Sequence, residues 1–234
     1  MIGYGQLLIF GLFMIISLII GEQLKARFRR YSKIPVNANL SGKEVAEKML
    51  HENGIYDVSV IAVDGQLSDH YNPANKTVSL SPDVYNGRNV AAAAVAAHEC
   101  GHAIQHAHSY AFLQLRTALV PIQNVSAKIM NFIFMAMFFG FLFLPGLINI
   151  QTALIIIVAC YAVFTLFAFI TLPVEIDASR RALAWLNVSG VTSSSSHEQA
   201  KDALKWAAYT YVVAALSSLA MLLYFLMLLT GRRN

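Results

Sequence analysis

The chain has 234 residues, of which 57% are hydrophobic and only 13% are charged, and its formal net charge is +4. Soluble domains usually carry about 25% charged residues, so this composition argues against an ordinary soluble protein. Most of the basic residues lie beside long apolar stretches, as in membrane proteins. This arrangement accounts for the positive charge, and no nucleic-acid partner is indicated.

Four apolar stretches reach or approach the roughly 20 residues that a helix needs to cross a bilayer. The predicted transmembrane helices are 4–20, 129–148, 152–172 and 207–230, and each lacks Asp, Glu, Lys, Arg and His. The first stretch has no basic residue before it and no small-residue cleavage site after it, so it is predicted to be an anchor and not a signal peptide.

The basic residues between these stretches predict an orientation. They concentrate in segments 22–128 and 173–206, whereas the short loop after residue 148 carries no charge. By the positive-inside rule, both polar segments face the cytoplasm and the N-terminus lies outside. The prediction is a multi-pass protein of a plasma membrane, with lipid as its surroundings. The sequence indicates no particular oligomeric state.

The first polar segment, 22–128, has the pattern of a small α+β domain. A capping box, Ser41-Gly-Lys-Glu44, predicts a helix that ends at Asn53-Gly54. Two strands are predicted at 55–63 and 76–80, followed by a helical turn at Ser81-Pro82 and a long helix over about 89–108. The predicted fold is mostly α, a four-span transmembrane bundle with a small cytoplasmic α+β domain.

The long helix carries the motif His98-Glu99-Cys100-Gly101-His102, an HExxH. Histidines four residues apart lie on one helix face, about 6 Å apart along the axis, and can share one zinc ion. The glutamate beside the first histidine is placed to take a proton from a water that the metal activates. At the chain's own residue frequencies, the motif is expected by chance only ~0.006 times. His98, His102 and Glu99 are therefore predicted to form a zinc-dependent hydrolytic centre.

A zinc site of this kind needs a third protein ligand. His106 lies about 12 Å along the helix from His98, so one ion does not readily contact both. His108 has the histidine spacing of the metzincins, but Gln105 stands where those proteins have a glycine that turns the chain back. Glu175 is the stronger candidate, because it is the first acidic residue after the third span and a helix beginning at Val174 would hold it at the membrane surface. Asp177 is turned about 200° away, so only one of the two carboxylates can face the metal, and Asp177 is well explained as an acidic residue near a helix start.

Beyond these single motifs, the sequence resembles the YugP-type bacterial membrane zinc metallopeptidases over nearly its whole length. The resemblance rests on SDHYNP at 68–73, LSPDVYNGRNVAAAAVAAHECGHAIQHA at 80–107 and LPVEIDASRRAL at 172–183. More distantly, the chain is similar to the HtpX and CAAX-prenyl protease class of gluzincins. The resemblance implies a bacterial plasma-membrane protein and a gluzincin-like zinc peptidase domain.

The gluzincin resemblance also implies roles for individual residues. Those proteins pair HExxH with a downstream ExxxD, so Glu175 would be the third zinc ligand and Ser179 replaces the aspartate. Ser179 or Asp177 would then support the ligand histidines. His70 or Tyr71 would stabilise the oxyanion, although both also fit a polar turn. An edge strand would bind substrate by strand addition; its residues here would be Lys76, Thr77, Val78, Ser79 and Leu80.

The resulting expectation is a metalloendopeptidase with one zinc ion per chain. It would cut membrane proteins or membrane-associated polypeptides at the cytoplasmic surface. The alternative is a catalytically silent zinc-binding scaffold or chaperone, which would have no need of Glu99. A metal transporter is disfavoured, because transport paths place ionisable groups within the spans and these spans contain none.

Overall fold

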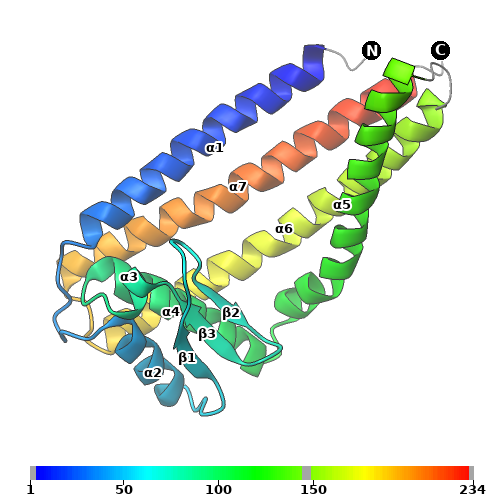
Figure 1. Ribbon diagram of the computed structural model, residues 1–234. Coiled ribbons are helices and arrows are strands. Elements are labelled where there is room, and N and C mark those ends of the chain that lie inside the picture. The colour runs from blue at the N-terminus through cyan, green and yellow to red at the C-terminus, as the bar shows by residue number, and fades with distance from the viewer. Residues whose placement is uncertain (1–3, 144–148, 232–234) are drawn as a thin grey trace. The chain divides into compact units, whose positions relative to one another are not determined.

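The structure is a computed structural model that describes residues 4–143 and 149–231. Most of these residues are helical, and a short sheet lies between the second and third helices (Figure 1). The elements in chain order are α1 (Tyr4–Tyr31), α2 (Gly42–Glu52), β1 (Ser59–Ala62), β2 (His70–Asn72), β3 (Thr77–Leu80), α3 (Pro82–Tyr85), α4 (Val90–Ala107), α5 (Ala111–Phe143), α6 (Ile150–Val188) and α7 (Ser194–Gly231).

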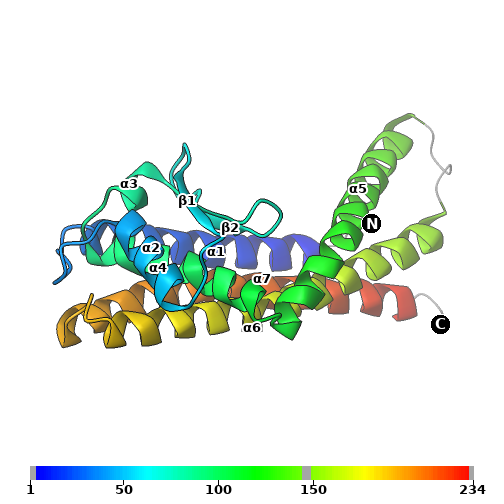
Figure 2. The same cartoon turned by 90° about the horizontal axis from the view of Figure 1, so that it is seen from below.

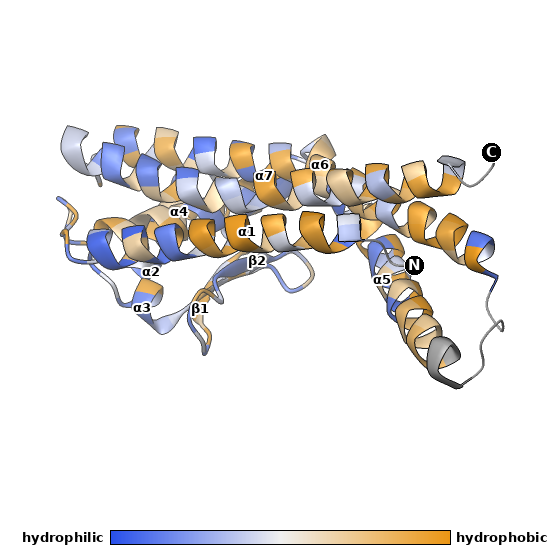
Figure 3. Cartoon of the chain, turned by 90° about the horizontal axis from the view of Figure 1, so that it is seen from above, coloured by the Kyte–Doolittle hydropathy of each residue, from blue (hydrophilic) through white to orange (hydrophobic). Residues whose placement is uncertain are grey.

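Helices α1, α5, α6 and α7 are long and apolar enough to cross a membrane. Figure 3 shows hydrophobic residues along these four helices, with hydrophilic residues at the end of α1 and in the adjoining parts of α6 and α7. They contain the predicted spans, although residues 144–148 lie outside the described part of the chain. The sequence predicts a new helix from Val174, but α6 runs without a break through Pro173. Membrane-protein helices tolerate such an internal proline.

The described residues fall into two compact units. The first includes parts of 1–17, 115–172 and 211–234, and the second comprises 18–114 and 173–210. Residues 115–128, predicted to belong to the polar segment, are part of the first unit because they continue helix α5. This unit exposes large apolar side chains, including Leu8 at 72% and Phe132 at 73%. Such exposure is unfavourable in water and suits contact with lipid.

Two capped helices organise the core of the second unit. Ser41 and Glu44 form the predicted capping box of α2, which buries Val45 and Met49 on its inner face. Asn89 caps α4, its side chain accepting a hydrogen bond from the backbone N–H of Ala92 at 2.9 Å. The alanine-rich first half of α4 is almost entirely buried against α2 and the sheet. Small side chains thus allow close packing around the histidine helix.

The sheet has the strand order β1-β3-β2, with β1 parallel and β2 antiparallel to β3. Strand β2 was not predicted, because His70–Asn72 precede a turn and are too short to show an alternating pattern. The first predicted strand, 55–63, is shortened to Ser59–Ala62. Strands β2 and β3 lie next to α4 (Figures 1 and 2).

The prediction that residues 76–80 form an open edge strand is wrong. Lys76 precedes β3, and Thr77 to Leu80 pair with β1 on one side, while Thr77 to Ser79 also pair with β2 on the other. A strand with neighbours on both sides has few backbone groups left for a substrate. If substrate adds to this sheet, it must do so along the outer side of β1 or β2.

Candidate metal centre

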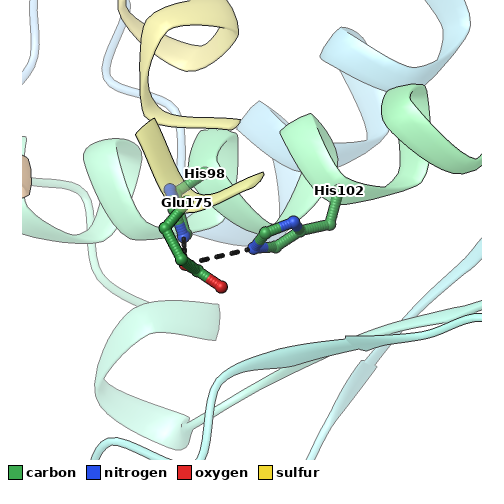
Figure 4. A group of neighbouring side chains, drawn as sticks. All are labelled: His98, His102 and Glu175. Carbon is green, nitrogen blue, oxygen red and sulfur yellow. Dashed lines mark ion pairs between the residues drawn. The ribbon is translucent and has the colours of Figure 1, made fainter. Parts of the chain in front are cut away.

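The three predicted ligands, His98, His102 and Glu175, lie together within the second unit. His98 and His102 project from α4, and Glu175 projects from α6 towards both rings (Figure 4). Glu175 Oε2 lies 3.3 Å from His98 Nε2 and 3.5 Å from His102 Nε2. One ligand atom from each residue lies within 4.8 Å of the other two.

These distances fit the requirements of a zinc ion. Two ligand atoms at about 2.1 Å from a tetrahedral zinc lie about 3.4 Å apart. Both ring-nitrogen to carboxylate distances, 3.3 and 3.5 Å, are close to this value. Two imidazoles and a carboxylate are also the donor set of many catalytic zinc sites, which leave a fourth position for water or substrate. The arrangement therefore fits zinc in both chemistry and spacing.

A glycine inside the motif allows the two helices to come this close. A Cβ atom added to Gly101 would lie 2.6 Å from the backbone oxygen of Ala178 on α6. That separation is shorter than van der Waals contact, and the obstacle is backbone, which cannot rotate away. Ala178 is itself fully buried. The HExxH motif thus provides the close helix contact as well as the metal ligands.

Burial and charge act in opposite directions on these groups. Burial by itself raises the pKa of Glu175, but hydrogen bonds from His102 and His98 outweigh it and hold that pKa well below its usual range. Burial likewise lowers the pKa of His102, and the contact with Glu175 reverses the effect, leaving it raised. The centre therefore holds an ionised carboxylate next to the two rings, and a negative charge in this position favours a bound cation.

Gln105, fully buried on α4, holds the ring of His102 in place. Its Nε2 donates to the backbone oxygen of Val174 at 2.8 Å and to Asp177 Oδ2 at 2.9 Å. Its Oε1 therefore faces His102 Nδ1, 3.0 Å away, and accepts a hydrogen bond from the N–H at that position. With Nδ1 protonated, the lone pair of a neutral His102 is on Nε2, the atom nearest Glu175.

Removing this support should weaken zinc binding. We expect Gln105→Ala to lower zinc affinity by about 10- to 100-fold, the usual effect of deleting a hydrogen-bond partner of a ligand histidine. Competition with a chromophoric chelator in detergent measures the affinity. Gln114→Ala, at an exposed helical position, is the matched control and should bind zinc as the wild type does. Wild-type affinity in Gln105→Ala would show that the ring is oriented by other contacts.

The other predicted supporting residues also contact the centre or its neighbours. Ser179 Oγ lies 3.1 Å from His98 Nδ1, so it occupies the supporting position that the resemblance implies. Asp177 is not among the ligand atoms that the described residues bring together, and it bonds Gln105, Arg180 and Arg181. It therefore reaches His102 only through Gln105. Burial raises the pKa of Asp177, but its hydrogen bonds outweigh this and lower it.

Glu99, the predicted catalytic base, is buried on α4 with 8% of its surface exposed. It immediately follows His98, and its negative charge contributes to the raised pKa of His102. The carboxylate is thus close enough to the histidines for its charge to act on one of them.

The remaining histidines lie outside the cluster. His108 is the exposed C-cap of α4 and does not join the group of ligand atoms that the described residues form. His106 is also exposed, and its Nδ1 lies 2.7 Å from the hydroxyl of Tyr71 on β2. His70 bonds instead to the backbone oxygen of Ser68 at 2.8 Å. Adjacent strand residues point to opposite faces, so Tyr71 and not His70 faces α4.

Two functional positions were not identified from the sequence. Gly101 is one of the unspecified positions of HExxH, and nothing in the adjacent sequence indicates a contact with α6. Gln105 lies three residues after His102, hence on the same face of the helix, which was an available signal. Its partners Val174 and Asp177, however, lie some 70 residues further along the chain.

An HExxH helix whose two histidines meet a glutamate from a second helix is the arrangement expected of a zinc metallopeptidase. The sequence model of the family described as "Putative neutral zinc metallopeptidase" matches residues 6–230. A Bacillus subtilis (strain 168) protein named "Putative membrane protease YugP" is 42% identical over 213 residues, which cover 91% of each chain. No solved structure gives a significant match. The chain belongs to this family, which confirms its resemblance to the YugP-type metallopeptidases.

Proposed function

We propose that the chain is a membrane-embedded metalloendopeptidase that uses one zinc ion to hydrolyse peptide bonds of membrane or membrane-associated proteins. The observation that carries the proposal is the convergence of His98 and His102 with Glu175, from two different helices. The family membership and the relative's name support the class of reaction, and the apolar helices support the choice of substrates.

In this proposal each residue has a defined task. His98, His102 and Glu175 would hold the metal, which when bound would supply a Lewis acid for activating a water molecule and the substrate carbonyl. Glu99 takes a proton from the attacking water and delivers it to the leaving amine. Gln105 and Ser179 keep the histidine rings in their binding orientation.

Tyr71 is the better placed of the two candidates for stabilising the oxyanion. It faces α4 and contacts His106, one helical turn beyond His102, whereas His70 is turned towards a backbone oxygen. Burial raises the pKa of Tyr71, so its hydroxyl stays protonated and able to donate. Oxyanion donors contribute about 100- to 1000-fold to kcat. If Tyr71→Phe left kcat unchanged, Tyr71 would not be the oxyanion donor.

We also propose that the metal centre works on the cytoplasmic side of a bacterial plasma membrane, with the N-terminus outside. The support is the distribution of basic residues, which concentrate in 22–128 and 173–206. Gln66 is exposed in the loop before β2, and both native cysteines are buried. A membrane-impermeant maleimide should therefore label Gln66→Cys only after spheroplasts are permeabilised. Labelling of Gln66→Cys in intact spheroplasts would show that the opposite orientation is correct.

Removal of the metal provides the test of the reaction class. We expect chelation to reduce cleavage of an unfolded, membrane-anchored polypeptide in proteoliposomes by at least about 100-fold, because both the water activation and the carbonyl polarisation are lost. Adding back one equivalent of zinc per chain should restore cleavage. Cleavage that survives complete chelation would refute a zinc peptidase. A fully zinc-loaded chain that cuts no member of a broad substrate set would favour the scaffold.

A further inference from the structure

A groove of about 510 Å³ lies between α6 and α7. Its walls come from one face of each helix, at residues 176–187 of α6 and 197–208 of α7. All of these residues belong to the second compact unit, and Figure 1 shows the two helices side by side. The volume is within the range of about 300–1,000 Å³ typical of small-molecule sites.

The charged side chains that line the groove are all basic. Arg180, Lys201 and Lys205 line it, and no carboxylate is among the described residues of its wall. Arg180 bonds Asp177 through one guanidinium nitrogen and is otherwise exposed, with 78% of its side chain accessible. Lys201 lies 3.5 Å from Glu198, but both side chains are largely exposed, so water screens this pair. The groove therefore presents cationic donors to an anionic ligand.

The groove is also apolar at one end. Ile176 and Ala208 form that end, the first lying four residues after the apolar stretch of α6 and the second just inside the apolar stretch of α7. Leu183 and Leu204 line the wall further along. The basic residues lie further from the predicted spans than this apolar end. Arg180 is one helical turn from Ile176, and Lys205 and Lys201 are about one and two turns from Ala208. This order matches a phospholipid, with its acyl chains in the bilayer and its phosphate at the surface.

We propose that this groove is a binding site for an anionic phospholipid, whose phosphate contacts Arg180, Lys201 and Lys205 and whose acyl chains pass between Ile176 and Ala208. The proposal requires that α6 and α7 span a bilayer, and it does not depend on the peptidase activity. Ser179 joins the two sites, because it lines the groove and contacts His98.

The test is lipid binding by the full-length chain, measured by native mass spectrometry in detergent. Phosphatidylglycerol and phosphatidylcholine with the same acyl chains are the two probes. The wild type should bind one phosphatidylglycerol molecule at least tenfold more tightly than phosphatidylcholine. In Lys201→Gln/Lys205→Gln that affinity should fall by about 25-fold, since a lysine near an anionic lipid surface contributes about fivefold.

A matched pair of lysines separates the groove from general surface charge. Lys25→Gln/Lys33→Gln removes the same charge near the end of α1, and Lys25 pairs with Glu22 much as Lys201 pairs with Glu198. This control should keep wild-type affinity within about threefold. Ala184→Phe fills the groove without changing its charge and should also weaken binding. Thermal unfolding checks that each variant is folded. Equal losses in the two lysine pairs, or equal affinity for the two lipids, would overturn the proposal.

Discussion

Replacing Glu99 with glutamine is expected to reduce peptide hydrolysis by about 100- to 10,000-fold while one zinc ion per chain stays bound. The size of the loss is that of removing a general acid–base group. Glutamine matches the shape of glutamate but cannot take a proton from water. Because the metal-binding atoms of His98, His102 and Glu175 are unchanged, metal binding should be too.

The measurement is kcat with a defined peptide substrate, alongside zinc content determined on the same sample. Glu47→Gln, at a half-buried position of α2 where Glu47 pairs with Lys43 at 3.6 Å, is the control and should retain full activity. Loss of zinc together with activity in Glu99→Gln would mean that Glu99 contributes to the metal site itself. Retained activity would exclude it as the base.

A second large effect is expected from the smallest possible change in the motif. Gly101→Ala adds one methyl group, which would lie 2.6 Å from the backbone oxygen of Ala178. The helices α4 and α6 must then separate, carrying Glu175 away from the two histidines. Overpacking of this kind usually costs about 1–3 kcal/mol in the free energy of unfolding. We also expect zinc affinity to fall by at least tenfold, because a shift of a few tenths of an ångström already disturbs metal–ligand distances.

Chemical unfolding and zinc titration of the same protein measure both effects. Gly21→Ala is the matched control, since Gly21 is also helical and an added Cβ would meet no described atom within 4 Å. This substitution should be neutral or stabilise the chain by up to about 1 kcal/mol. Wild-type zinc affinity in Gly101→Ala would contradict the close-packing explanation of the motif.

The metal centre could be predicted from the sequence to the extent that its signals are local. Once the segment is helical, the HExxH spacing fixes where the two histidines and the glutamate lie relative to one another. The alanine-rich stretch before them strongly favours a helix. Glu175 could be proposed because it is the first acidic residue beyond a long apolar stretch. Its meeting with His98 and His102, however, depends on packing of α4 against α6 at Gly101.

The features that escaped prediction depend on partners distant in sequence. Strand β2 consists of only three residues and becomes a strand by pairing with β3. Its presence turned the predicted edge strand into the central one. The support of His102 by Gln105 likewise requires acceptors on α6. A proline usually ends a helix, but α6 continues through Pro173. In membrane proteins, neighbouring helices compensate for the lost backbone hydrogen bond.

The most direct test of the central claim is the zinc content per chain of the purified protein in detergent, measured by mass spectrometry for wild type and Glu175→Ala. Glu198→Ala, at an exposed position on α7, is the control, and helical content by circular dichroism verifies folding. We predict about one zinc per chain in wild type and control, and less than about a tenth of that in Glu175→Ala, since two histidines alone bind zinc weakly. Full zinc occupancy in a folded Glu175→Ala would contradict the assignment of Glu175 as the third ligand.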